Sequence, residues 1–252
     1  MTGTQARLAA AALAAAAFTT PASAQKTTAE YASGATRPKS VALLPVEATV
    51  TRARAVEIEG LVDDGVQLGA QFNARLSSLM VAKGYEVLVV GAEQIDADPK
   101  LQEYVVEASR NFRETMSKCR PKNVPKHLCK VGDSVQVLAD RLHVDALVFS
   151  NLQITITPAG RAVLTALIGG VGPGASSSLE IVDGRTGELE ALFFAAAMVG
   201  PGDKTDVDIR GYAATLAEKT TNKMPSSDPS ARMDTGKNDD QAVDEVEQLL
   251  KQ

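Results

Sequence analysis

The residues of this chain best suited to chemistry stand in one stretch, Cys119 to Cys129, with His127 between the two cysteines. These are the only cysteines of the sequence, and His127 is one of its two histidines. Two thiols at this spacing can form a disulfide, or they can begin a metal site together with the imidazole. The metal alternative is incomplete, because a structural zinc site has four protein ligands and this set offers three.

The amino-terminal segment 1–24 decides between these chemistries by setting the compartment. One basic residue precedes the apolar run from Leu8 to Phe18, and small residues then lead to Ala24. This is the pattern of a secretory signal peptide cleaved after Ala24, and it is too short to span a membrane. No cysteine lies near the cleavage position, so we expect a periplasmic protein that is not lipidated. In that oxidising compartment Cys119 and Cys129 are predicted to form a disulfide, which adds about 2–3 kcal/mol by chain closure.

The same stretch is rich in positive charge. Two interpretations stand side by side: a solvated loop, or a surface on which Lys122 and Lys126 contact an acidic partner or anionic headgroups. The basic residues of the stretch are Lys118, Arg120, Lys122, Lys126 and Lys130.

A second candidate surface is the apolar, glycine-punctuated segment from Ala162 to Gly174. It is either a loop that binds a partner or touches a membrane, or a buried edge strand or short core helix. Its glycines do not make a phosphate-binding loop, because no Gly-Lys-Ser/Thr ending follows them. The side chains that would contact a partner are Leu164, Leu167, Ile168 and Val171.

His143 stands near Asp140 and Asp145, so it could act as a base oriented by a carboxylate, or these residues could serve a helix cap and a turn. The paired acids Asp63 and Asp64 could take part in glycosidase chemistry only across a cleft, which spacing alone does not supply. No catalytic residue, metal ligand or cofactor is therefore assigned.

The amino-acid composition of the chain limits the classes of partner that it can bind. The formal net charge is −5, aromatic residues make up 4% and tryptophan is absent, so neither a basic stripe nor a stacking platform for nucleic acid is expected. We expect an envelope protein as partner, with a homo-oligomer as an alternative, and membrane contact that is at most peripheral.

The hydrophobic patterns predict an α/β fold in which helices pack on both faces of a mixed sheet, a single three-layer domain over residues 40–224. The strands are expected over Ser40–Val50, Tyr85–Val90 (buried on both faces), Val144–Ile156 and a hairpin within Ser177–Ala197. The helices are expected from about Glu57 to Lys83, from a cap at Asp98 to Met116, from a cap at Asp133 to Leu142, and from Asp206 to Lys223. Residues 25–39 are expected to be a flexible lead-in and 225–252 a disordered tail, in which 241–252 could form a short helix.

Four motifs occur in an order that resembles a known family: Ser40-Val-Ala-Leu-Leu-Pro-Val, Gly84-Tyr-Glu-Val, Ala139-Asp-Arg-Leu-His-Val-Asp-Ala-Leu-Val-Phe and Val182-Asp-Gly-Arg-Thr-Gly-Glu-Leu. This order is similar to the periplasmic α/β domain of CsgG-type secretion lipoproteins, LpoB-like lipoproteins and the TolB amino-terminal domain. The resemblance covers roughly residues 40–224 and implies accessory work in the envelope. It also implies two features that this chain lacks, a lipidated cysteine and long membrane-inserting hairpins.

The resulting hypothesis is a non-catalytic periplasmic accessory protein for envelope assembly, secretion or polysaccharide export, acting through protein contacts. The alternative is a periplasmic small-ligand or glycan-processing enzyme without a recognisable motif. An enzyme would show a concave pocket lined by converging titratable groups, whereas an accessory protein would show a flat or edge-strand surface.

Overall fold

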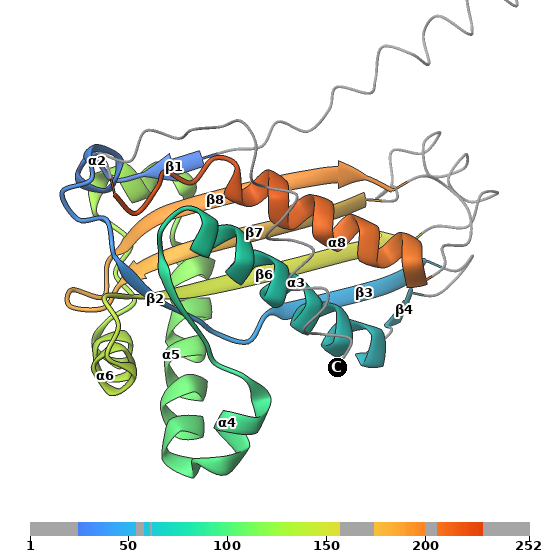
Figure 1. Cartoon of the computed structure of the whole chain (residues 1–252), viewed down its shortest axis with the longest axis horizontal. Helices are drawn as coiled ribbons and strands as arrows, with labels where there is room; N and C mark the ends of the chain where they lie inside the picture. The colour runs from blue at the N-terminus through green and yellow to red at the C-terminus, as the bar shows by residue number, and fades with distance from the viewer. Residues whose placement is uncertain (1–24, 54–57, 61, 157–173, 200–205, 229–252) are drawn as a thin grey trace, which may run out of the picture.

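The structure, a computed structural model, describes residues 25–53, 58–60, 62–156, 174–199 and 206–228. The expected signal peptide and the four side chains Leu164, Leu167, Ile168 and Val171 lie outside the described residues, as does the tail from residue 229. Within the described residues the predicted α/β class is confirmed, with a mixed sheet between two layers of helices (Figure 1).

An eight-stranded sheet forms the middle layer. Its strands follow the order β1-β8-β7-β6-β2-β5, while β3 continues beside β6 beyond the end of β2 and pairs with β4. β2 runs parallel to both β5 and β6, whereas β6, β7 and β8 are antiparallel. The strands are β1 Gln25–Thr27, β2 Ser40–Leu43, β3 Glu47–Ala53, β4 Ile58–Gly60, β5 Glu86–Val89, β6 Ala146–Ile156, β7 Gly174–Asp183 and β8 Leu189–Met198.

Helices provide the crossovers that parallel strands require. They are α2 Ala29–Ser33, α3 Val62–Ala82, α4 Ala92–Ala97, α5 Pro99–Lys118, the 3₁₀ helix η1 Pro121–Lys126, α6 Asp133–Leu142 and α8 Asp206–Thr221. The cap predicted for α5 is confirmed, since the Asp98 carboxylate accepts the backbone N–H groups of Lys100 and Leu101 at 3.0 and 3.1 Å. The N-cap of α6 is Gly132, and Asp133 is the first helical residue instead of the cap.

α3 and α8 cover one face of the sheet side by side (Figure 1). The core beneath them is built from every second residue of the central strands, as strand geometry requires. Its largest fully buried side chains include Phe72, Leu76 and Met80 of α3 with Leu152, Ile154 and Phe193 of the sheet.

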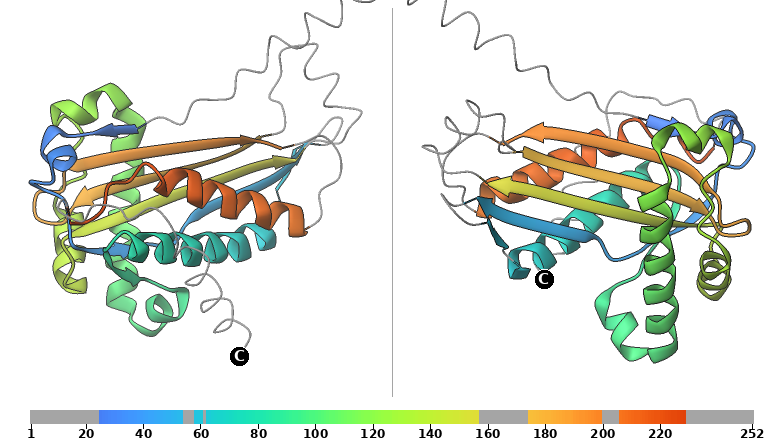
Figure 2. Two further views of the ribbon diagram at one scale, coloured as in Figure 1. Left: turned by 45° about the horizontal axis from the view of Figure 1, so that its top comes forward. Right: turned by 180° about the vertical axis from the view of Figure 1, so that it is seen from behind.

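The other face is covered only in part by the described residues. α5 crosses the strands near one end of the sheet, with α6 and η1 close by, and no described helix lies over the opposite ends of β3, β6, β7 and β8 (Figure 2, right). Phe112 of α5 stacks on Phe149 of β6 with ring centroids 4.0 Å apart, which fixes where the helix crosses. This second core is therefore confined to one half of the sheet.

Two predicted element boundaries and the predicted burial of one strand were wrong for local reasons. The strand predicted over Ser40–Val50 is divided at Pro45, because proline cannot donate to a ladder, and its second half becomes β3 beside β6. The helix predicted from about Glu57 begins at Val62, because residues 58–60 pair with β3 instead. β5 lies at the edge of the sheet, where Val89 is 38% exposed, so burial of this strand on both faces was also wrong.

The segment 25–39, expected to be a flexible lead-in, carries β1 and α2 within its first nine residues. The Thr28 hydroxyl caps α2 by accepting the Tyr31 backbone N–H at 3.2 Å, and Tyr31 is completely buried. The phenol oxygen of Tyr31 lies 3.3 Å from that of Tyr85. One aromatic side chain therefore attaches a mostly polar segment to the core.

The first residues of the expected tail are likewise held. The Ser227 N–H donates to the Lys83 carbonyl at 2.9 Å, and the Tyr85 hydroxyl donates to the Pro225 carbonyl at 3.0 Å. Arg37 donates to the Ser226 carbonyl at 2.7 Å, so the segment that leads into β2 and the end of the described chain meet beside the start of β5. The disorder predicted from residue 225 was therefore wrong for residues 225–228.

Candidate functional site

The cystine loop, residues 119–129, is closed as predicted. Cys119 and Cys129 form a disulfide with their Cα atoms 5.7 Å apart, so the two sulfurs are not available as metal ligands. The loop is better held than its sequence suggests, because Val124 is completely buried and the Cys129 carbonyl accepts the Leu189 N–H at 2.9 Å. Backbone contacts with β8 thus fix a segment whose sequence is rich in Pro and Lys.

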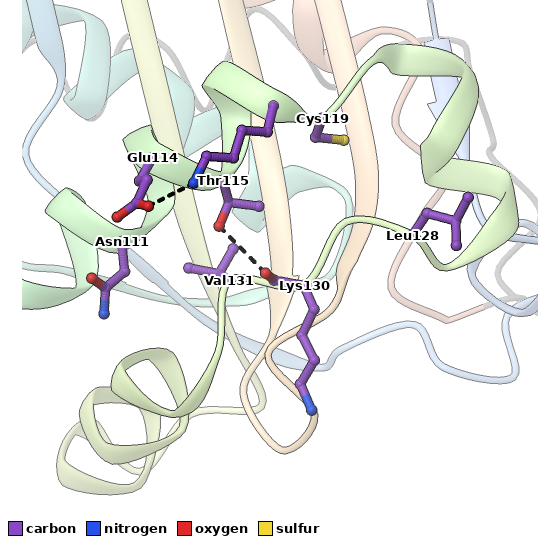
Figure 3. A pocket seen from close by; sticks show the side chains of 8 residues that line it. Asn111, Glu114, Thr115, Cys119, Leu128, Lys130 and Val131 are labelled. Carbon is purple, nitrogen blue, oxygen red and sulfur yellow. Dashed lines mark hydrogen bonds and ion pairs between the residues drawn. The ribbon is translucent and has the colours of Figure 1, made fainter.

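The predicted basic surface is only partly free in the described structure. Lys122 and Lys126 lie exposed on η1, whereas Lys118 forms an ion pair with Glu114 at 2.7 Å. A hollow of 430 Å³ lies beside the disulfide, between the end of α5 and the strand-like segment at Lys130 (Figure 3). Thr115 donates to the Lys130 carbonyl at 3.3 Å across this hollow, and Leu128 at its rim is 66% exposed. The hollow is open and mixed in polarity, which suits a contact surface better than an enclosed ligand site.

His143 serves the turn and not a catalytic pair in the described structure. It is the C-cap of α6 in the left-handed conformation, with φ of 56° and its N–H directed to the Asp140 carbonyl at 3.3 Å. The Asp145 carboxylate accepts the backbone N–H groups of Lys39 and Ser40, each at 3.0 Å. These residues therefore join α6 and β6 to the start of β2.

A groove of 360 Å³ runs between α5 and the partly covered face of the sheet. Phe112 and Met116 of α5 line one wall, and hydroxyl and amide side chains of β6 and β7 line the other. Arg113 and Glu47 lie at its rim with their charged atoms 3.4 Å apart. The polar wall consists of Asn151, Gln153, Ser176 and Ser178.

Glu180 of β7 is the unusual residue of this groove. Its side chain is 5% exposed although it belongs to the same face as Ser178. Burial raises the pKa of the Glu180 carboxyl to about 8, against the lowering effect of a hydrogen bond with Ser178, and the charge of Glu47 adds to the rise. The carboxyl is therefore mainly protonated at neutral pH and can donate a hydrogen bond.

From the polar wall of the groove, which includes Gln153 and Ser176, the sheet face continues without a helix over it among the described residues. We define the open sheet surface as a row of four residues with two more beside it. The row is Thr49, Gln153, Ser176 and Ala196, and the two beside it are Thr155 and Met198. Each member of the row is the direct cross-strand partner of the next, so the row lies on one face. Gln153 is exposed and Met198 is 51% exposed.

Sequence reasoning missed both the groove and Glu180. The one available signal was a glutamate inside the otherwise apolar run Ser178-Leu-Glu-Ile-Val, which could also belong to a half-exposed strand. The groove depends on where α5 crosses the sheet, and no local pattern specifies that crossing. The proposed contact residues Leu164, Leu167, Ile168 and Val171 lie outside the described structure, and the role of Lys122 and Lys126 stays a prediction.

No described helix is long and apolar enough to cross a membrane. No protein-family model and no curated protein sequence matches the chain.

Several solved structures are distantly similar to the chain. The PelC dodecamer from Paraburkholderia phytofirmans is 9% identical with a TM-score of 0.36, covering 81% of this chain and 97% of that one. Lipoprotein GNA1162 from Neisseria meningitidis is 14% identical with a TM-score of 0.33, covering 74% of this chain and 99% of that one. The LpoB C-terminal domain from Salmonella enterica is 10% identical with a TM-score of 0.26, covering 64% and 84%. LpoB is one of the protein types named in the sequence resemblance, and these distant likenesses establish no function for this chain.

Proposed function

We propose that this protein is a non-catalytic periplasmic accessory protein that serves envelope assembly, secretion or polysaccharide export through protein contacts. The observation that carries the proposal is the open sheet surface, half of a sheet face over which no described helix lies. The predicted export signal and the order of the sequence motifs support the same compartment and class of work.

The composition of the open sheet surface suits a protein partner. Sheets in three-layer α/β domains are normally covered on both faces, so an uncovered half leaves contact area available. Its row of small, hydroxyl and amide side chains carries no charge, and Met198 adds an exposed apolar group. Depletion of charge at the centre of a surface is typical of protein interfaces.

The segment predicted to bind a partner begins and ends at this surface. β6 ends at Ile156 and β7 begins at Gly174, so residues 157–173 connect two strands that form the surface. Leu164, Leu167, Ile168 and Val171 are proposed to extend the same contact area. Lys122 and Lys126 lie on η1 and are proposed as a separate, electrostatic contact.

Arginine substitution tests the open sheet surface. Gln153→Arg places a bulky charge at the centre of the row, whereas Thr215→Arg places the same charge on an exposed position of α8. We expect purified wild-type protein and Thr215→Arg to co-purify the same periplasmic partner, and Gln153→Arg to lose it while keeping the wild-type unfolding midpoint. Equal recovery of that partner with both variants would contradict the proposal.

A second candidate, ligand binding with Glu180 as a hydrogen-bond donor or acid, is favoured by the buried, neutral carboxyl in the groove. NMR titration of the protein with soluble peptidoglycan and polysaccharide fragments tests this candidate. Saturable shifts at Asn151, Ser178 and Glu180 that disappear in Glu180→Ala would support it. Absence of such shifts at millimolar concentrations of fragment would contradict ligand binding in the groove.

A further inference from the structure

A histidine and three glutamates converge at the end of the cystine loop. The Nδ1 atom of His127 lies 3.0 Å from Glu188 Oε2, and its Nε2 atom lies 3.1 Å from Glu30 Oε2. One ligand atom from each of His127, Glu188 and Glu190 lies within 4.8 Å of the other two. The histidine is the C-cap of η1, and Glu30 belongs to α2. Glu188 immediately precedes β8, and Glu190 is its second residue.

The backbone holds these groups in place from two neighbouring segments. Lys130 forms an antiparallel bridge with Glu188, and the Val131 N–H donates to the Gly187 carbonyl at 2.7 Å. The disulfide fixes the same segment from the other side. Leu189 is buried in the second core, so the alternating Glu188 and Glu190 side chains project away from it.

The negative charge of this cluster favours the binding of a cation. Glu190 is 4% exposed, and its carboxylate accepts hydrogen bonds from the hydroxyls of Thr28 and Thr36, which carry no charge to offset it. Glu30 and Glu188 add two further carboxylates, and among the described residues His127 is the one basic group that pairs with them. Three acidic groups thus surround one imidazole.

The imidazole places one ring nitrogen against each of two carboxylates, so one carboxylate can orient the ring while the other nitrogen faces a ligand. When the Nε2–H group donates to Glu30, the Nδ1 lone pair faces the Glu188 carboxylate at 3.0 Å. Only a proton or a bound cation can lie between two such electron-rich atoms. A carboxylate that holds the second ring nitrogen of a ligating histidine is the usual outer partner at zinc sites.

We propose that His127, Glu188 and Glu190 bind one Zn²⁺ ion, with Glu30 as the positioning residue for the imidazole. An imidazole nitrogen with carboxylate oxygens suits Zn²⁺, whereas Ca²⁺ and Mg²⁺ prefer sets made of oxygen alone. Ligand atoms of tetrahedral zinc lie about 3.3 Å apart, so the atoms of the His127, Glu188 and Glu190 set, which lie within 4.8 Å of one another, must approach by at most about 1.5 Å. Solvent supplies the fourth ligand.

Titration calorimetry with ZnCl₂ tests the site on tag-free protein of residues 25–252 that has been freed of metal with a chelator. We expect one Zn²⁺ per chain and no comparable heat with MgCl₂ or CaCl₂. His127→Asn and Glu188→Gln should weaken binding by more than about ten-fold, and Glu30→Gln by about ten-fold. Asparagine tolerates the left-handed backbone of residue 127, where φ is 54°.

His143 provides the matched control, because it has φ of 56°, is exposed and also caps a helix. His143→Asn should bind Zn²⁺ like the wild type. Unfolding midpoints measured in chelator check that each variant is folded, and Glu188→Gln leaves the backbone at residue 127 untouched. The proposal is overturned if wild-type protein shows no saturable Zn²⁺ binding, if both site variants bind like wild type, or if His143→Asn weakens binding equally.

Discussion

At the scale of single residues, Glu180 makes the stability of the fold depend on pH. The folded protein keeps this carboxyl protonated up to about pH 8, whereas in the unfolded chain it ionises near its ordinary pKa of 4.5. Between these values the folded state binds one proton that the unfolded state does not bind. The stabilisation is therefore complete below pH 4.5 and is lost as the pH rises through 8.

We predict that Glu180→Gln removes this dependence, because glutamine is neutral at every pH. The variant should match the wild type at pH 5 and exceed its free energy of unfolding by a few kcal/mol at pH 8.5. Urea unfolding at both pH values measures the difference, with exposed Glu103→Gln as the control. Parallel pH profiles for wild type and Glu180→Gln would contradict the assignment.

At the scale of elements, the cystine loop follows α5 in the chain and is hydrogen-bonded to the start of β8. The disulfide stabilises the fold mainly by restricting the unfolded chain, and the effect is moderate because its ring spans a sequence separation of only 10 residues. The backbone bonds of Cys129 and Val131 to the residues before β8 should survive without it. Loss of the disulfide should therefore cost stability without loss of the fold.

We predict that the double variant Cys119→Ser, Cys129→Ser folds but loses about 3 kcal/mol of unfolding free energy. Urea unfolding of wild type with and without reductant gives an independent value for the same loss, and reductant should leave the double variant unchanged. A double variant as stable as the oxidised wild type would show that the ring contributes nothing.

The elements also show what sequence patterns can and cannot specify. The turn between β7 and β8 was predictable because its signals are local: the Asp183 carboxylate accepts the Arg185 and Thr186 N–H groups at 2.9 and 2.7 Å, and Gly187 takes φ of 67°. The cap at Asp98 was predictable for the same reason. Both depend on residues within a few positions of one another.

The parts that escaped prediction depend on distant residues. His127 meets Glu188 and Glu30 across separations of 61 and 97 residues, and no spacing rule anticipates such meetings. Residues 25–39 were expected to be flexible because only Tyr31 distinguishes them, and its burial requires Tyr85 and Phe193 from the rest of the core. The groove likewise exists because one stacked aromatic pair positions α5.

At the scale of the whole molecule, the last described residues pack beside the start of β5. Met224 is 1% exposed in the first core, and residues 225–227 bind the end of α3 and Arg37. A domain boundary placed before Met224 would remove both the buried side chain and these hydrogen bonds. The folded unit therefore includes residues 224–227.

We predict that a chain of residues 25–223 is less stable than one of residues 25–228 by several kcal/mol, because a buried methionine alone is worth about 2–5 kcal/mol. Urea midpoints of the two chains measure this difference. A variant of the longer chain with Met224→Ala separates the side chain from the hydrogen bonds. Identical midpoints for all three proteins would mean that the segment after α8 does not stabilise the domain.

The pairing of β1 with β8 has a consequence for the order of folding during export. Gln25 lies opposite Phe193, so the residues that would emerge first from a translocation channel find their partner strand only after most of the chain has followed. Contacts this distant in sequence form slowly, because the entropy of closing a long loop must be lost before the contacts contribute free energy. The edge of the sheet next to the predicted cleavage position is thus completed last, which leaves the amino terminus accessible to a processing peptidase while the rest of the domain folds.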